Sequence, residues 1–155
     1  MIKIAEVMGP EPSPLWKMVK QCGVDYVVGG FPRAGAKGDP ADIHPDQRPW
    51  SFPNIVRAKT AYENGGFTLT TIEARPPLNK AKLGLPDRDQ EIEYACDLIR
   101  TMGKLGIEVW CYEWMPVLNW TRTSTTTPAR GGAMVTGFDN ELFKHAPNTE
   151  HSVTE

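Results

Sequence analysis

The chain has 155 residues, with 17 lysines and arginines against 19 aspartates and glutamates, for a net charge of −2. Apolar residues make up 40% and charged residues 23%, which is the composition of an ordinary globular domain. Because positive charge is not in excess and no basic run occurs, the sequence gives no indication of a nucleic-acid partner or an acidic membrane surface.

No stretch predicts a membrane span or a secretion signal. No window approaches the roughly 20 apolar residues of a spanning helix, and residues 1–10 lack the apolar core and cleavage site of a signal peptide. Cys22, Cys96 and Cys111 are odd in number and widely spaced, which argues against a disulfide framework or a zinc site. We therefore expect a cytoplasmic protein in a reducing compartment.

The chain opens with two predicted strands around a short helix. Residues 2–8 predict a strand that stops at a Gly-Pro pair. Residues 12–21 predict a helix with Ser13 as N-cap and Pro14 at its first position. Residues 24–29, β-branched and bounded by glycines, predict the second strand.

A long loop, a weaker helix and a third strand come next. The loop, residues 30–50, is rich in Gly and Pro, and loops of this length inside a domain are usually functional or disordered. A lid is one role that we consider for it. Residues 52–64 predict the helix, which stops at Asn64-Gly65-Gly66. Residues 67–72 predict the strand, and a second loop covers residues 73–86.

The segment from Asp87 to Leu105 has the clearest helical pattern. Its apolar side chains recur every three or four positions, which places them on one face of a helix. Asp87 or Asp89 supplies the cap, and Gly106 ends the helix. A fourth strand is predicted over residues 107–112, followed by a polar, irregular region with one helical stretch near 139–145. The predicted inward face is Ile92, Ala95, Leu98, Ile99, Met102 and Leu105.

The predicted order is β-α-β-α-β-α-β, which favours a parallel sheet with helices outside it. Long loops follow the strands and short glycine turns follow the helices, which is typical of a (β/α)8 TIM barrel. A complete barrel needs about 250 residues. We therefore predict an α/β fold holding only the first four or so β/α units, with residues 1–155 as the N-terminal portion of one domain and the C-terminal half absent. A small open α/β domain is the alternative.

Three stretches and the opening IKIAEVMGP form an ordered set: KLGLPDRDQEIE (82–93), LGIEVWCYEWMPVLNWTRT (105–123) and RGGAMVTGFD (130–139). The set is fairly specific, and it resembles mannonate dehydratase of hexuronate and glucuronate catabolism. The resemblance covers most of the chain, which corresponds to the first half or less of a typical family member.

The resemblance implies a metal-dependent hydro-lyase with a xylose-isomerase-like TIM barrel. The family dehydrates D-mannonate to 2-dehydro-3-deoxy-D-gluconate with Mn²⁺ or Fe²⁺, by proton abstraction next to a carboxylate and loss of a β-hydroxyl. It also implies that the metal ligands, namely histidines, a cysteine and an aspartate, lie on later strands. No metal ligand is therefore assigned in this chain, which we expect to be inactive alone.

Two candidate substrate-binding residues lie in WMPVLNWTRT, residues 114–123, directly after the fourth predicted strand. Trp120 and Arg122 are expected to face the substrate, and the planar guanidinium of Arg122 suits a carboxylate because it can bind both oxygens. The alternative is that Trp120 packs on the barrel rim and Arg122 forms a structural salt bridge.

Glu73 and Tyr112, which end the third and fourth predicted strands, are further candidates for substrate binding. Glu73 can bind sugar hydroxyls, or it can pair with Arg75 or a lysine. Tyr112 shares a strand face with Trp114, whereas Cys111, on the opposite face, is predicted to be a small buried hydrophobe.

Two other features are not interpreted as binding sites. His44 in DIHPD is predicted to be an exposed loop residue rather than a metal ligand, and RGGAM, residues 130–134, lacks the spacing of a phosphate loop. The expected partner is a small sugar acid, D-mannonate, and a homo-oligomer is left open. Two rival functions remain: another xylose-isomerase-like sugar isomerase or epimerase, and a non-catalytic half-barrel that binds a partner or itself.

Overall fold

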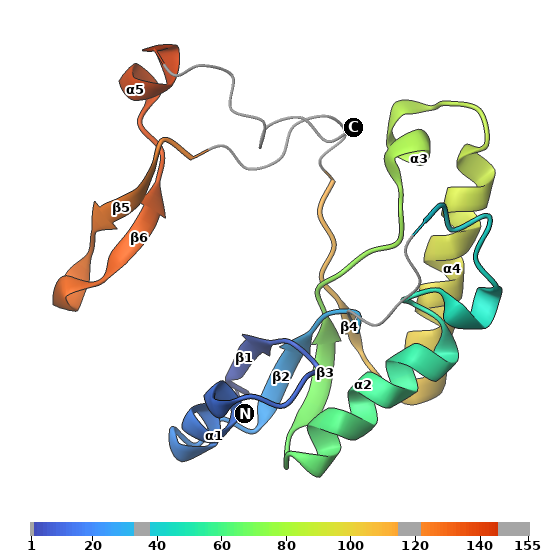
Figure 1. The fold of residues 1–155 in the computed structure, drawn as a ribbon, viewed down its shortest axis with the longest axis horizontal. Coiled ribbons are helices and arrows are strands. Elements are labelled where there is room, and N and C mark those ends of the chain that lie inside the picture. The colour runs from blue at the N-terminus through green and yellow to red at the C-terminus, as the bar shows by residue number, and fades with distance from the viewer. Residues whose placement is uncertain (1, 33–37, 115–121, 146–155) are drawn as a thin grey trace. The chain divides into compact units, whose positions relative to one another are not determined.

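The structure, a computed structural model, describes residues 2–32, 38–114 and 122–145. The chain divides into two compact units, Met1–Glu113 and Trp114–Glu155. Figure 1 shows the sheet and helices of the first unit and the hairpin of the second.

A four-stranded parallel sheet forms the centre of the first unit (Figure 1). The strands lie in chain order, so each pairs with the next along the sequence. Parallel strands direct their carboxyl ends toward one edge of the sheet, and the segments that follow the strands meet there. The predicted parallel α/β fold is confirmed. The strands are β1 (Ala5–Met8), β2 (Tyr26–Gly29), β3 (Thr68–Ile72) and β4 (Val109–Trp110).

The helices of the first unit alternate with the strands as predicted. Ser13 and Pro14 begin α1 in the predicted positions, and α2 has the predicted bounds. The sequence analysis missed α3, which lies in the segment predicted to be a loop, because five residues are too few for a periodic pattern. The helices are α1 (Pro14–Gln21), the 3-10 turn η1 (Pro45–Gln47), α2 (Phe52–Asn64), α3 (Asn79–Leu83) and α4 (Arg88–Leu105).

Aromatic residues join the elements of the core. The ring of Trp16 on α1 stacks on Tyr62 of α2 at 5.1 Å between centroids, and its edge meets Phe67 at 5.6 Å. The Tyr62 hydroxyl donates a hydrogen bond of 2.6 Å to the Met8 carbonyl at the end of β1. Burial, and secondarily the charge of Glu11, raises the pKa of Tyr62, so the hydroxyl keeps the proton that it donates.

Gly65, directly after α2, allows Trp16 to approach the backbone closely. A Cβ at this position would lie 2.7 Å from two ring carbons of Trp16, which is closer than non-bonded carbon atoms approach. The Asn64-Gly65-Gly66 stop that was predicted from the sequence therefore also makes room for the aromatic core.

The predicted inward face of α4 is wrong in part. Leu98 and Met102 are buried, but Ile92 and Ile99 are 45% and 52% exposed. Besides Leu98 and Met102, the helix buries Glu91, Tyr94 and Thr101. The reason is that a polar and aromatic stripe of α4 packs against the loops after β2 and β3, so the periodic apolar residues do not alone define the covered face.

The second unit contains an antiparallel hairpin and one short helix. The helix, α5 (Asn140–His145), confirms the helical stretch predicted near 139–145. The hairpin was missed because the Thr-rich β5 has no alternation of apolar and polar residues. Gly131 and Gly132 have φ of 74° and 78° and form its turn, which explains the RGGAM sequence. The strands are β5 (Ser124–Pro128) and β6 (Met134–Gly137), with the turn η2 (Arg130–Gly132) between them.

Among its described residues, the second unit has none that is buried. Phe138 and Phe143 contact each other at 5.6 Å between centroids but stay 54% and 47% exposed. Two strands and one turn of helix cannot bury a core by themselves.

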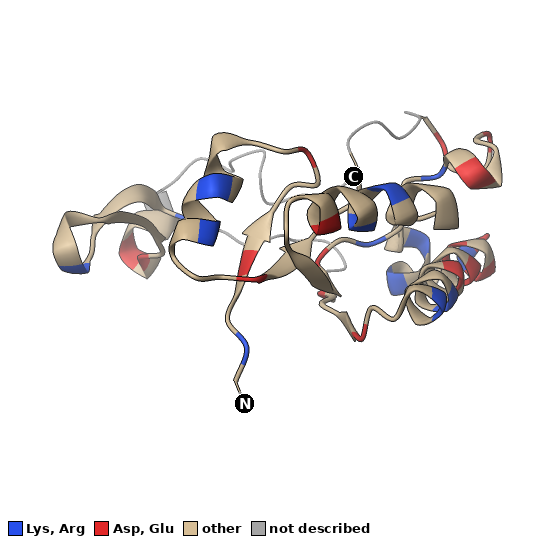
Figure 2. Cartoon of the chain, turned by 90° about the horizontal axis from the view of Figure 1, so that it is seen from below, with Lys and Arg blue, Asp and Glu red and all other residues tan. Residues whose placement is uncertain are grey.

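Charges on the ribbon are mixed in sign. Figure 2 shows Lys and Arg interspersed with Asp and Glu along the ribbon. None of the helices in the described ranges is long and apolar enough to cross a membrane.

Candidate active site

The carboxyl ends of β3 and β4 bring two predicted site residues to one edge of the sheet. Glu73 follows β3 and Tyr112 follows β4, and the two strands pair in parallel. Backbone hydrogen bonds fix the strand exits, the residues that directly follow β3 and β4. The Glu73 amide donates to the Gly29 carbonyl at 2.8 Å, and the Cys111 amide donates to the Ile72 carbonyl at 2.9 Å. Side chains at this edge project from rigid strands, which favours a fixed site.

An ion pair also joins the two exits. Arg75, two residues after Glu73, pairs with Glu113, and both side chains are about one third exposed or less. The indole Nε1 of Trp110 donates to the Ala74 carbonyl at 2.9 Å. The alternative in which Arg75 pairs with Glu73 is therefore not the arrangement found, and the Glu73 side chain is exposed.

Tyr112 is open to solvent at the same edge. It is 60% exposed, and its ring lies against Trp110 at 5.5 Å between centroids. Its phenol is available as a hydrogen-bond donor or acceptor for a sugar hydroxyl. Cys111 is exposed as well, so the prediction of a buried cysteine is wrong. The reason is that β4 is the edge strand and ends at Trp110, one residue before Cys111.

Arg122 lies at the base of the hairpin in the second unit. Its Nε donates to the Thr136 hydroxyl at 3.2 Å. The neighbouring Thr123 bonds to the chain at the end of β6 and just after it: its amide donates to the Gly137 carbonyl at 2.9 Å, and its hydroxyl accepts from the Asp139 amide at 2.8 Å. The hairpin therefore fixes the backbone at the end of the WTRT segment. Trp120 lies outside the described residues.

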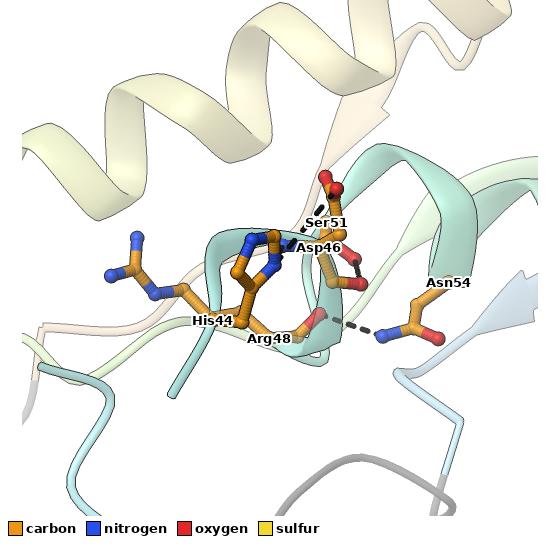
Figure 3. Close-up of polar contacts among 5 residues, drawn as sticks. All are labelled: His44, Asp46, Arg48, Ser51 and Asn54. Carbon is orange, nitrogen blue, oxygen red and sulfur yellow. Dashed lines mark hydrogen bonds and ion pairs between the residues drawn. The ribbon is translucent and has the colours of Figure 1, made fainter. Parts of the chain in front are cut away.

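The loop after β2 is anchored by polar contacts that the sequence analysis did not identify (Figure 3). The Ser51 hydroxyl donates to the Asp46 carbonyl at 2.8 Å, and the Asn54 amide donates to the Arg48 carbonyl at 2.8 Å. Arg48 itself donates to the Pro40 carbonyl at 3.0 Å, and its guanidinium lies 4.7 Å from the centre of the Tyr94 ring. These contacts anchor residues 40–54 to one another and to Tyr94 of α4.

His44 is an exposed residue of this loop. Its Nδ1 accepts a hydrogen bond of 3.3 Å from the Asp46 amide, and its side chain is 68% exposed (Figure 3). The prediction of an exposed loop histidine is confirmed. Within residues 2–32, 38–114 and 122–145, no group of three or more His, Cys, Asp and Glu side chains could hold a metal ion. These residues therefore do not fit a catalytic Mn²⁺ or Fe²⁺.

The Arg75–Glu113 pair makes a testable contribution to stability. We expect a double-mutant cycle with Arg75→Gln and Glu113→Gln to give a coupling of about 1 kcal/mol, at the upper end for pairs of this kind because both side chains are mostly covered. Urea denaturation of the four proteins measures it. The exposed pair Arg100 and Glu93 serves as control and is expected to couple by about half as much or less. A coupling near zero for Arg75 and Glu113 would show that the contact does not stabilise the strand exits.

Comparisons with known proteins agree with this fold. The family model described as D-mannonate dehydratase (UxuA) matches residues 5–153. A mannonate dehydratase of Thermotoga maritima is 36% identical over 95 residues, which are 61% of this chain and 26% of that protein. One from Streptococcus pneumoniae is 38% identical over 89 residues, 57% of this chain and 24% of that protein.

A solved structure extends the likeness over nearly the whole chain. The crystal structure of mannonate dehydratase from Streptococcus suis serotype 2 superposes with a TM-score of 0.75 at 25% sequence identity, covering 97% of this chain and 41% of that one. The chain thus spans about a quarter of the length of the curated relatives that it matches. With a family model matched from residue 5 to residue 153, the chain belongs to the D-mannonate dehydratase family.

Proposed function

We propose that the chain is the N-terminal part of a (β/α)8-barrel D-mannonate dehydratase, which removes water from D-mannonate to give 2-dehydro-3-deoxy-D-gluconate. The observation that carries this proposal is the family match over residues 5–153. The expected setting is the cytoplasm, where hexuronate catabolism takes place, and the expected partner is the sugar acid itself.

The open sheet supports the partial-barrel part of the proposal. Four parallel strands lie in chain order, and β1 and β4 each have one edge that pairs with no described strand. The solved relative has more than twice the length that this chain covers. Four further β/α units joining β4 to β1 would close eight strands, the number that a TIM barrel needs. On this proposal, residues 1–155 are one portion of a single domain.

The candidate residues have separate tasks in this proposal. The guanidinium of Arg122 binds the carboxylate of D-mannonate with two parallel hydrogen bonds. Glu73 accepts hydrogen bonds from sugar hydroxyls, and the Tyr112 phenol orients another hydroxyl at the same sheet edge. Trp120 covers the apolar face of the carbon chain. Because the described residues do not fit a metal ion, Mn²⁺ or Fe²⁺ remains an expectation from the family, with ligands on later strands.

Activity measurements test the proposal. The coding DNA beyond codon 155 defines the polypeptide to compare with the 155-residue chain. We expect the longer polypeptide, supplied with Mn²⁺, to convert D-mannonate to a product lighter by one water, as detected by mass spectrometry. The 155-residue chain alone is expected to give no product above background.

Three outcomes would contradict the proposal in different ways. A product isomeric with D-mannonate would favour another sugar isomerase or epimerase of the same barrel type. Full dehydratase activity of the 155-residue chain alone would refute the partial barrel. A stop codon directly after codon 155, with a monodisperse and inactive dimer in solution, would favour the half-barrel that binds itself.

A further inference from the structure

Trp110 is the last residue of β4, and its side chain reaches beyond the end of the neighbouring strand. In the ladder of β3 and β4 it pairs with Ile72, the last residue of β3. Its indole Nε1 nevertheless donates to the Ala74 carbonyl at 2.9 Å, two residues after β3 ends. That carbonyl directly follows Glu73 in the chain. A side chain of β4 therefore fixes the backbone that leaves β3.

The same indole supports the second candidate residue at this sheet edge. Its ring lies 5.5 Å from the Tyr112 ring between centroids, with 39° between the ring planes. Tyr112 is 60% exposed, so this contact limits where an otherwise open phenol points. An exposed side chain that is not held must be ordered when a ligand binds, and this ordering weakens affinity.

Packing makes Trp110 a rigid support for both residues. It is partly buried and packs against the hydrophobic core, as Ala74 does. Buried indoles usually donate their N–H to some acceptor, so the hydrogen bond alone does not indicate a function. The place of the acceptor does, because the contacts of one side chain join the segment after β3 to the segment after β4. Each segment carries one candidate substrate-binding residue.

We propose that Trp110 is a positioning residue, which fixes Glu73 and Tyr112 relative to each other before the substrate binds. It acts through the Ala74 carbonyl and the Tyr112 ring and makes no contact with the substrate. The inference rests on the proposed function, in which Glu73 and Tyr112 bind hydroxyls of D-mannonate. A pre-ordered site binds the substrate and the transition state more tightly to the same extent, so we expect the benefit in KM and not in kcat.

Steady-state kinetics of the longer polypeptide test this role. Trp110→Phe removes the N–H donor and keeps an aromatic ring. It is expected to raise KM for D-mannonate about fivefold and to leave kcat within about twofold of the wild type. In a background that carries both Glu73→Ala and Tyr112→Ala, the same substitution is expected to change KM by less than about twofold, because the side chains that it positions are absent.

Trp16→Phe is the matched control. Trp16 also donates its indole N–H to a backbone carbonyl, that of Gly9 at 3.3 Å, and its ring also contacts a tyrosine ring. Its acceptor follows β1, at the other end of the strand order. We therefore expect Trp16→Phe to lower stability and to leave KM within about twofold of the wild type.

Hydrogen–deuterium exchange gives a second readout that needs no activity. The amides of Glu73 and Cys111 donate to neighbouring strands, so their exchange reports the opening of the two strand exits. Trp110→Phe is expected to speed exchange in residues 73–75 and 111–113 by at least about threefold, whereas Trp16→Phe leaves it unchanged.

Several results would overturn the proposal. These are an unchanged KM in Trp110→Phe, an equal rise of KM in the background without Glu73 and Tyr112, an equal rise in Trp16→Phe, or unchanged exchange at both strand exits. If the longer polypeptide does not turn over D-mannonate, the proposed function fails, and the exchange experiment alone decides whether Trp110 fixes the exits. If Trp110→Phe does not fold by circular dichroism, Trp110→Met replaces it in each measurement, because methionine fills irregular gaps in a core.

Discussion

Replacing Trp16 with alanine is expected to lower the free energy of unfolding by about 3–5 kcal/mol, the range for removing a large aromatic side chain from a core. Trp16 is 6% exposed, stacks on Tyr62 and meets Phe67 edge-on. Its indole Nε1 also donates to the Gly9 carbonyl at 3.3 Å. The loss approaches the whole stability of a small domain, about 5–15 kcal/mol. Urea denaturation followed by far-ultraviolet circular dichroism measures it.

The neighbouring residue on α1 provides the matched control. Leu15 is 48% exposed, so Leu15→Ala is expected to change stability by about 0.5 kcal/mol or less. A loss below about 1 kcal/mol for Trp16→Ala would mean that α1 does not contribute to the core as the structure has it.

The second large effect concerns Arg122 in the polypeptide that turns over D-mannonate. We expect Arg122→Gln to lower kcat/KM about 100-fold, which corresponds to about 2.7 kcal/mol, because a charged donor pair to the substrate carboxylate is lost. Arg122→Lys keeps the charge but not the two parallel hydrogen bonds, so its kcat/KM is expected to lie between those of the wild type and Arg122→Gln. Steady-state kinetics over a range of D-mannonate concentrations separates the change in KM from that in kcat.

Arg130 is the control for this experiment. It lies at the tip of the same hairpin and is exposed, so Arg130→Gln is expected to leave kcat/KM within about twofold of the wild type. Unchanged kinetics in a folded Arg122→Gln protein would indicate that the arginine has a structural role, such as its hydrogen bond to Thr136, and does not bind the substrate.

Sequence patterns predicted the order of elements where local and tertiary signals agree. The end of α2 follows from the Asn64-Gly65-Gly66 stop after it, and Gly65 also fits the core packing. The parallel sheet followed from alternation of strands and helices alone. The same reasoning placed Glu73 and Tyr112 at strand ends, which parallel pairing brings to one edge.

Contacts between distant segments could not be predicted from the sequence. The Arg75–Glu113 pair and the contact of Arg48 with Tyr94 join residues tens of positions apart, and neither has a periodic signature. Ile92 and Ile99 follow the helical period but are half exposed, because period shows which residues share a face and not what covers it. The exposure of Cys111 likewise depends on β4 being an edge strand.

The two unpaired strand edges set conditions for how such a protein is made. A chain leaves the ribosome N-terminus first at about 5–20 residues per second. If this part begins a barrel, its sheet forms while the strands that would cover it are still being synthesised. The free edge of β1 then stays unpaired for the longest time, because a closed barrel pairs β1 with the last strand. Exposed apolar residues near both edges would be open to chaperones during this time. They are Ile2, Ile4, Val7, Ile99 and Val109, each about half exposed or more.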